Sequence, residues 1–171
     1  GYKSSSSAPI TKRVQSVAMK LIGHGADEEE VSSTLRKISL EVKNGTIPLA
    51  DIIQSTRLTK PPHEYDKPTP GAKAAMHYNE HIKGDKWKKG DSVSWTYIAN
   101  TGTLPDYFTI KGEKKRTQFM AFRDIDELDS VVIDWEKILD VLVKKKLKRL
   151  YESVGWDIAI AAGDIVPETY W

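Results

Sequence analysis

Three side chains in the middle of this chain have the types and the spacing of a zinc-enzyme site. His77, Glu80 and His81 form the pattern H-x-x-E-H, in which two histidines one helical turn apart bind zinc and the glutamate activates a water molecule. Glu152 is a candidate for a distant third ligand. So short a pattern arises easily by chance, and the chain is short for a peptidase of this class. We therefore retain a zinc peptidase only as an alternative.

Other candidate chemistry is weaker. The acidic segment 124–129 lacks the spaced ligands and the central glycine of a calcium loop, so a solvated acidic turn before the last helix is the preferred interpretation. Gly23-x-Gly25 lacks the lysine that follows a phosphate-binding loop. The absence of cysteine excludes disulfides and a thiolate nucleophile. We expect no cofactor in this chain.

A second type of chemistry, the holding of anions, is indicated by the sequence LTKPPHEY at residues 58–65. Its consecutive prolines keep the backbone extended and remove amide donors. A loop fixed in this way presents Thr59, Lys60 and Tyr65 to a repeating anionic surface at little entropic cost. These groups hold phosphate oxygens and read no bases, which predicts binding that is independent of nucleic-acid sequence and sensitive to salt.

The distribution of charge agrees with this interpretation better than the net charge does. The net charge is only +2, but residues 57–89 contain eight Lys and Arg against four Asp and Glu. Local charge steers a polyanion more than the average does. The run Lys144-Lys145-Lys146-Leu147-Lys148-Arg149 is interpreted as the solvated face of a helix.

Hydrophobic periodicity predicts an α+β fold that is mostly helical. The first two helices, at residues 10–22 and 26–43, should form a helical hairpin. Pro70-Gly71 opens a third helix, 72–82, and a long helix at 134–153 comes last. A strand is predicted at 92–98, and two more at 107–110 and 117–122 are expected to pair with it, with 111–116 as the turn.

Composition sets the class of protein. Hydrophobic residues make up 39% of the sequence and charged residues 29%, which is normal for a soluble globular protein. No apolar run approaches the roughly 20 residues of a membrane span, so no membrane association is expected. The first residue is Gly1, which is consistent with a piece of a longer polypeptide or with a removed initiator.

The order of five segments resembles the C-terminal part of the family B DNA polymerases. The segments are GYKSSSSAP, the helical hairpin, RLTKPPHEYDKPTPGAKAA, KKGDSVSWTYI and VIDWEKILDVLVKKKLKRL. In that family the last palm strand leaves through a serine-containing segment into the thumb helices. A T-K-x-x-x-x-Y element, a K-x-G-D-x-V-x-Y strand and a D-x-x-Y-Y helix follow. The resemblance covers nearly the whole chain and implies a thumb-like fold: a helical hairpin, a small antiparallel sheet and a long C-terminal helix.

The resemblance also implies which residues face DNA. Four lead-in residues would lie at the palm–thumb junction near the primer strand: Lys3, Ser4, Ser5 and Ser6. Thr59, Lys60 and Tyr65 would face the duplex backbone. Further candidates are Arg57, Lys67, Thr69 and Lys73. Lys89-Gly90-Asp91 matches the turn that enters the strand, which is a structural element.

The sequence departs from the family pattern at several positions. Trp95 stands where the family often has tyrosine, and Trp135-Glu136-Lys137 replaces the aromatic pair of the last helix. Pro70-Gly71 replaces a common Pro-His, so a histidine contact to DNA is not expected there. The tail VPETYW lacks the signature with which some members bind a sliding clamp.

The family's catalytic groups are not in this sequence. Two-metal phosphoryl transfer needs the palm carboxylates of a Y-G-D-T-D type motif, and the exonuclease acids and the nucleotide-binding helix are missing too. The resemblance therefore implies the DNA-binding thumb of a DNA-directed DNA polymerase, acting in DNA replication. Mg²⁺ is expected in a palm supplied elsewhere. The chain would be a fragment of a longer polymerase or the small subunit of a split one.

This interpretation sets the expected partners and domains. The partners are double-stranded primer–template DNA and the palm and exonuclease portion or large subunit, in the cytoplasm or wherever the host's replication machinery works. Residues 1–8 would be the lead-in from the palm, 9–57 the thumb hairpin, and 58–171 the thumb tip with a C-terminal subdomain. A protein–protein docking module built on the hairpin and the last helix is the other alternative.

Overall fold

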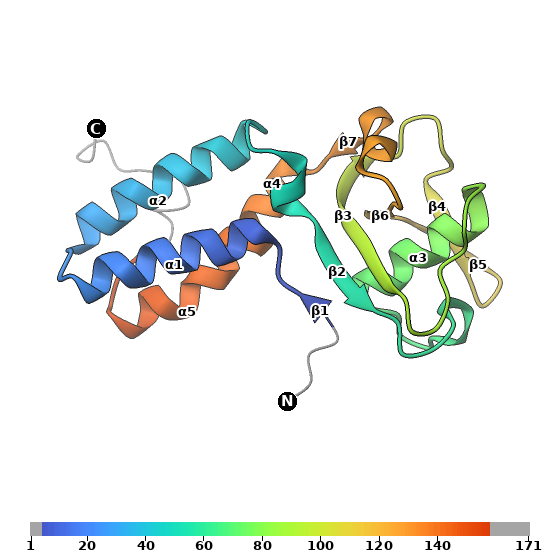
Figure 1. Ribbon diagram of the computed structural model, residues 1–171, viewed down its shortest axis with the longest axis horizontal. Helices are drawn as coiled ribbons and strands as arrows, with labels where there is room; N and C mark the ends of the chain where they lie inside the picture. The colour runs from blue at the N-terminus through green and yellow to red at the C-terminus, as the bar shows by residue number, and fades with distance from the viewer. Residues whose placement is uncertain (1–4, 158–171) are drawn as a thin grey trace. The chain divides into compact units, whose positions relative to one another are not determined.

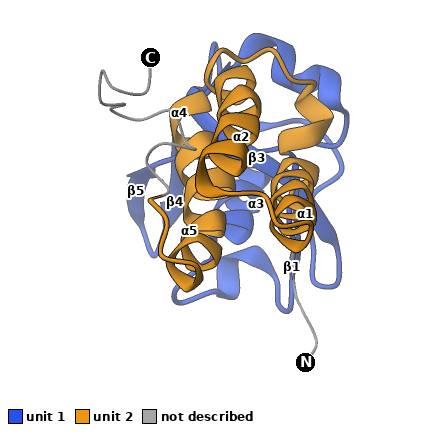
Figure 2. Cartoon of the chain, turned by 90° about the vertical axis from the view of Figure 1, so that its left-hand side faces the viewer, with its two compact units in different colours: residues 1–7, 53–134 blue, residues 8–52, 135–171 orange. Residues whose placement is uncertain are grey.

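The computed structural model of the protein describes residues 5–157, and its fold is α+β, as the sequence predicts. The chain divides into two compact units (Figure 2). The helical unit comprises residues 8–52 and 135–171, and the sheet unit comprises residues 1–7 and 53–134. The last helix therefore belongs to the same unit as the hairpin. Within residues 5–157 no helix is long and apolar enough to cross a membrane.

The helical unit begins with the predicted hairpin, formed by α1 (Pro9–Gly23) and α2 (Glu28–Lys43) (Figure 1). Pro9 occupies the first turn of α1, where a backbone N–H would have no acceptor within the helix, so proline loses no hydrogen bond there. Asp27 caps α2 by accepting a hydrogen bond from the backbone nitrogen of Glu30 at 2.9 Å. One apolar stripe of α2 is fully buried: Val31, Leu35 and Val42. The short 3₁₀ helix η1 (Leu49–Ile52) ends this part of the chain.

The predicted last helix is continuous from Trp135 to Ser153 but has a wide turn in its middle. It consists of α4 (Trp135–Ile138), the π-helical segment η4 (Leu139–Lys144) and α5 (Lys145–Ser153). The hydroxyl of Thr11 on α1 donates to the carbonyl oxygen of Leu142 at 2.6 Å. The hydroxyls of Ser32 and Tyr151 are hydrogen-bonded at 2.9 Å, both buried. These two buried bonds fix the last helix against the hairpin.

The sheet unit is built on an antiparallel sheet (Figure 1). Its strands lie in the order β1 (Ser5–Ser6), β2 (Gln54–Arg57), β3 (Ser92–Asn100) and β6 (Phe119–Ala121), and β7 (Val132–Ile133) also pairs with β3. The predicted strand at 92–98 is therefore the central one. Trp95 on β3 donates its indole N–H to the Thr56 hydroxyl of β2 at 2.9 Å, inside the core.

Helix α3 (Pro70–His81) packs on this sheet through small residues: Gly71, Ala72, Ala74 and Ala75. A Cβ atom at Gly71 would lie 2.5 Å from the Cβ and Oγ1 atoms of Thr56. The first turn of α3 therefore approaches β2 so closely that only glycine fits there. This contact explains why Gly71 follows the helix-opening proline.

The prediction of the strand pairing at 107–122 was wrong in one respect. Strand β4 (Tyr107–Ile110) pairs with β5 (Glu113–Arg116) in a separate two-stranded sheet, and only β6 joins the main sheet. The turn is just Lys111-Gly112, and both residues have positive φ, 50° and 77°. Such a two-residue turn matches the twist of an antiparallel hairpin, so the residues assigned to a long turn instead extend the hairpin as β5.

Candidate nucleic-acid interface

The structure brings together the three residues that the sequence singled out at 58–65. Tyr65 folds back so that its phenolic oxygen accepts a hydrogen bond from the backbone N–H of Thr59 at 2.9 Å and lies 3.2 Å from the Thr59 hydroxyl oxygen. The ammonium of Lys60 lies 5.4 Å from the centre of the Tyr65 ring, within the range of a cation–π contact. Thr59 and Lys60 are exposed. The loop is therefore closed on itself with its polar groups facing solvent.

The prolines set the shape of this loop. Pro61 is extended at φ −56° and ψ 141°, and the 3₁₀ turn η2 (Pro62–Glu64) follows at once. Pro62 is buried, and its carbonyl accepts from the backbone nitrogen of Tyr65 at 3.3 Å. This sharp turn reverses the chain and returns Tyr65 to Thr59. Because φ of a proline is fixed, the arrangement loses little entropy on forming.

The two hydroxyl groups of the loop leave one hydrogen for an outside acceptor. Thr59 and Tyr65 each carry one hydroxyl hydrogen, and the bond between them uses one, whichever of the two is the donor. The other hydrogen points to no partner within the pair. Beside the Lys60 ammonium, it makes the loop a donor site for an anionic oxygen, such as that of a phosphate.

The base of the loop is fixed to the turn that precedes β3. Leu58 is buried, and it exchanges backbone hydrogen bonds with that turn: its N–H donates to Asp91 at 2.9 Å, and its carbonyl accepts from Gly90 at 2.8 Å. Gly90 has a φ of +91°, and the Asp91 carboxylate accepts from the backbone nitrogen of Lys88 at 2.9 Å. The Lys89-Gly90-Asp91 sequence is thus a structural turn that holds the loop.

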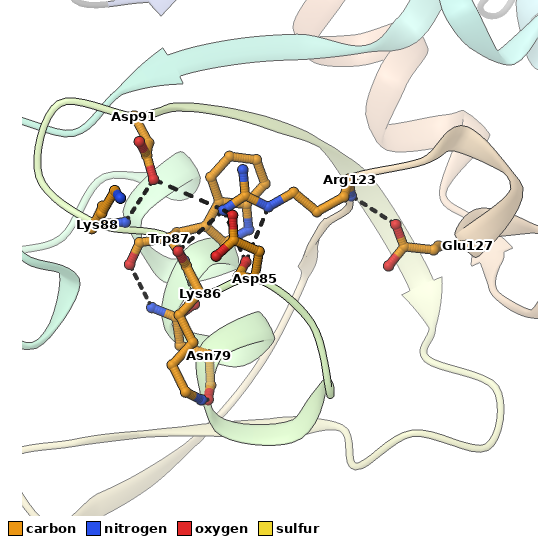
Figure 3. Close-up of polar contacts among 8 residues, drawn as sticks. All are labelled: Asn79, Asp85, Lys86, Trp87, Lys88, Asp91, Arg123 and Glu127. Carbon is orange, nitrogen blue, oxygen red and sulfur yellow. Dashed lines mark hydrogen bonds and ion pairs between the residues drawn. The ribbon is translucent and has the colours of Figure 1, made fainter.

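Arg123, which the sequence did not single out, stabilises the same turn (Figure 3). Its guanidinium lies 3.4 Å from the centre of the Trp87 ring and donates to the carbonyl oxygens of Asp85 and Lys86 at 2.8 and 3.1 Å. The side-chain amide of Asn79 also holds Trp87: its Nδ2 donates to the Trp87 carbonyl oxygen and its Oδ1 accepts from the Trp87 backbone nitrogen, both at 2.8 Å. Figure 3 shows these groups converging from α3, the turn and the segment after β6. No sequence motif could have indicated this convergence, because the partners lie far apart in the chain.

The remaining predicted contact residues have varied surroundings. Arg57 ends β2 and is exposed, as is Lys67. Thr69 caps α3, accepting from the backbone nitrogen of Ala72 at 3.4 Å. The Lys73 ammonium lies 5.9 Å from the centre of the Phe119 ring. Ser5 and Ser6 form β1, paired with β2, while Lys3 and Ser4 lie outside the described residues. Contacts of all these residues with DNA stay predictions.

The H-x-x-E-H residues have structural partners in the sheet unit. Nε2 of His77 lies 2.7 Å from the Pro105 carbonyl oxygen, and Nε2 of His81 lies 2.7 Å from that of Tyr107. The Glu80 carboxylate accepts from the backbone nitrogen and the hydroxyl of Thr109, at 2.7 and 3.1 Å. Together they fasten β4 to α3. Within residues 5–157, no three His, Asp or Glu side chains come together to hold a metal ion.

Burial gives His77 an altered proton affinity. Its side chain is fully buried, and the desolvation of the charged form lowers the pKa of His77 from 6.5, against the opposing effect of the bond to Pro105. The neutral ring donates from Nε2 to the carbonyl, since a carbonyl oxygen only accepts. His77 is therefore a neutral core residue.

The acidic segment before the last helix is likewise a capped turn. Asp124 accepts from the backbone nitrogen of Asp126 at 3.0 Å, and Glu127 accepts from those of Arg123 and Asp124 at 2.7 and 2.6 Å. These reciprocal bonds form a capping box at the start of η3 (Ile125–Ser130). The carboxylates of Asp124 and Glu127 thus accept from backbone donors within a turn before the last helix, in agreement with the interpretation as an acidic turn.

Comparison with known proteins shows a likeness to solved structures. No protein-family model and no curated protein sequence matches this chain. Among solved structures, the chain is similar to the family B DNA polymerase from the hyperthermophilic archaeon Pyrobaculum calidifontis, with a TM-score of 0.61 and 19% sequence identity. The match covers 94% of this chain but only 18% of that protein. The two proteins share a fold over nearly all of this chain, which spans about a fifth of the polymerase.

Proposed function

We propose that this chain is the thumb portion of a family B DNA polymerase and holds primer–template duplex through its sugar–phosphate backbone. The observation that carries the proposal is the closed loop at 58–65, with the Lys60 ammonium and the Thr59–Tyr65 hydroxyl pair presented together. The fold shared with a polymerase of this family supports the same assignment.

The proposed thumb holds DNA and does not react with it. Palm carboxylates and their Mg²⁺ ions would be supplied by another part of the polypeptide or by a large subunit of a split polymerase. The chain would then act in DNA replication wherever that machinery lies. The lead-in residues, among them Ser5 and Ser6, would lie close to the primer strand.

The chemistry of the loop predicts how binding should behave. Each phosphate that a lysine or arginine neutralises releases condensed counterions. For a duplex, each such contact makes the negative slope of log K against log salt steeper by about 0.9. Base sequence should have little effect, because the loop offers no group shaped to read base edges.

The test is the binding of a fluorescently labelled 20-base-pair duplex, measured by anisotropy across a salt series. The double variant Lys60→Ala with Tyr65→Ala should weaken binding and make the salt slope shallower by about 0.9. Lys37→Ala with Lys43→Ala, two exposed positions on α2, is the control for lost surface charge. An unchanged affinity and slope in the loop variant, with the fold intact by circular dichroism, would reject the proposed contact.

A further inference from the structure

A groove in the sheet unit has the composition of a second binding site. It lies where the start of α3 meets β4, β5 and β6, and it has a volume of about 370 Å³. Its floor is formed by Ile110, which is half-buried, and by the rings of Phe108 and Phe119, which are only 3% and 9% exposed, and its ionisable lining residues are all cationic: Lys73, Lys115 and Arg116. This volume lies within the range of small-molecule sites and is large enough for one nucleotide.

The surroundings of the groove add to its positive potential. All four residues of β5 are exposed, and Lys114 on this strand lies over the ring of Tyr107, with its ammonium 4.5 Å from the ring centre. Glu113 pairs with Lys115 at 3.1 Å, but both side chains are more than half exposed. Surface pairs of this kind are weak, so Lys115 can exchange this partner for a phosphate.

We propose that this groove binds an unpaired strand of nucleic acid, with one base against the apolar floor and the flanking phosphates on Lys115 and Arg116. Proteins that hold single strands combine a cationic groove with an aromatic surface that takes the bases. Lys73 lies over Phe119 and brings a third cation to the edge of the same floor. The groove therefore combines several cations with an apolar floor, of which Ile110 is the most exposed part.

The apolar floor favours an unpaired strand over a duplex. In a duplex the base faces are stacked on one another, so an apolar floor gains no contact from it, and only the cations would contribute. An unpaired base can leave solvent and cover Ile110 and the small exposed part of Phe119. The residues that line the groove are distinct from those of the loop at 58–65, and only Lys73, a predicted duplex contact, is shared by the two proposals. Whether the groove binds an unpaired strand does not depend on whether the loop holds a duplex.

The test uses a labelled twelve-nucleotide thymidine strand and, in parallel, the 20-base-pair duplex. Lys115→Ala with Arg116→Ala should weaken single-strand binding and make its salt slope shallower by about 1.4, since each phosphate contact contributes about 0.7 for single strands. Lys37→Ala with Lys43→Ala should change neither, and the loop variant should act on the duplex alone. Loss of duplex and single-strand affinity in equal measure would overturn the proposal.

A second variant tests the apolar floor without changing charge. Ile110 lines the groove and is half-buried, so Ile110→Thr should remove apolar surface from the floor while keeping the β-branched shape that suits β4. We expect this variant to bind the thymidine strand about fourfold more weakly, the effect of losing about one buried methyl group of apolar contact. An affinity equal to that of the wild type, or no measurable binding by the wild type at 50 mM salt, would overturn the assignment.

Discussion

The phenolic oxygen of Tyr65 lies 2.9 Å from the backbone nitrogen of Thr59, and this bond closes the loop at 58–65 between two residues that the sequence separates by a pair of prolines. It satisfies an amide on an exposed segment and sets the place of Lys60 beside the ring. The loop therefore has one preferred shape before any ligand arrives. Preorganisation of this kind raises affinity, because less ordering remains to be done on binding.

Comparing Tyr65→Phe with Thr59→Val should show whether duplex binding depends more on the closed shape of the loop or on its hydroxyl donors. The variant loses the acceptor for the Thr59 N–H and one hydroxyl, whereas Thr59→Val keeps the backbone bond and loses only a hydroxyl. Because a hydrogen bond contributes about 0.5–1.5 kcal/mol, we expect duplex affinity to fall several-fold in Tyr65→Phe and less in Thr59→Val. Anisotropy measurements on both variants check this order. Equal affinities of both variants and wild type would show that neither group matters.

Gly71→Ala should destabilise the protein. The added Cβ would lie 2.5 Å from atoms of Thr56, and overpacking of this kind costs about 1–3 kcal/mol of unfolding free energy. The control is Gly23→Ala at the end of α1, where a Cβ would meet nothing within 4 Å. Urea titrations should show a lower midpoint for the first variant and little change for the second. A Gly71→Ala midpoint equal to that of the wild type would show that α3 can move away from β2.

His77 should make the protein less stable in mild acid. Its pKa is lowered in the folded state, so the unfolded chain takes up a proton near pH 6.5 while the folded chain does not. The unfolding free energy should therefore fall as the pH drops below about 6.5, and go on falling until the lowered folded pKa is passed.

The check is the melting temperature as a function of pH, between pH 7.5 and 5.0. His77→Gln keeps a donor for the Pro105 carbonyl and has no titrating ring, so it should show a flatter profile than the wild type. His63→Gln, at an exposed loop position, is the matched control. A profile for His77→Gln as steep as that of the wild type would assign the acid sensitivity to other groups.

Arg123→Lys should loosen the turn that holds the loop. Lysine keeps the charge but cannot stack flat on Trp87 while donating to two carbonyl oxygens. Hydrogen bonds to charged groups contribute about 1.5–3 kcal/mol, and because Arg123 is partly exposed we expect a loss at the lower end of this range. We also expect faster hydrogen exchange at the amides of Leu58 and Gly90. Arg149→Lys, on the exposed face of α5, should change neither. Unaltered exchange in Arg123→Lys would contradict a supporting role.

Local patterns predicted the helices and the central strand well. Pro9 and Pro70 each begin a helix, because these signals act within one or two turns. Of the apolar face predicted for α2, positions 31, 35, 38 and 42 are buried, whereas Leu40 is exposed. The Thr59, Lys60 and Tyr65 cluster was also found, since the prolines between them determine the turn. The DNA contacts of these residues stay predictions.

Features that depend on distant parts of the chain were not predicted. Arg123 contacts Trp87 across 36 positions of sequence. Strand β4 pairs with β5 because Lys111-Gly112 adopts positive φ in a two-residue turn, whereas a longer turn at 111–116 was predicted from the sequence. The groove at Lys115 and Arg116 was missed for the same reason. Only the pairing of β5 with β4 brings those cations to the side of Phe119.

The π-helical segment η4 determines which face of α5 points into the core. The backbone nitrogen of Lys145 bonds to the carbonyl oxygen of Asp140, five residues back, so this turn holds one residue more than a regular helical turn. Removing a single residue from Leu139–Lys144 would leave an unbroken α-helix but rotate α5 by about 100°. Leu147 and Tyr151 would then swing out of the core and the lysines into it. The one extra residue in the π-helical turn, and not the length of the last helix, therefore decides which side chains of α5 are buried.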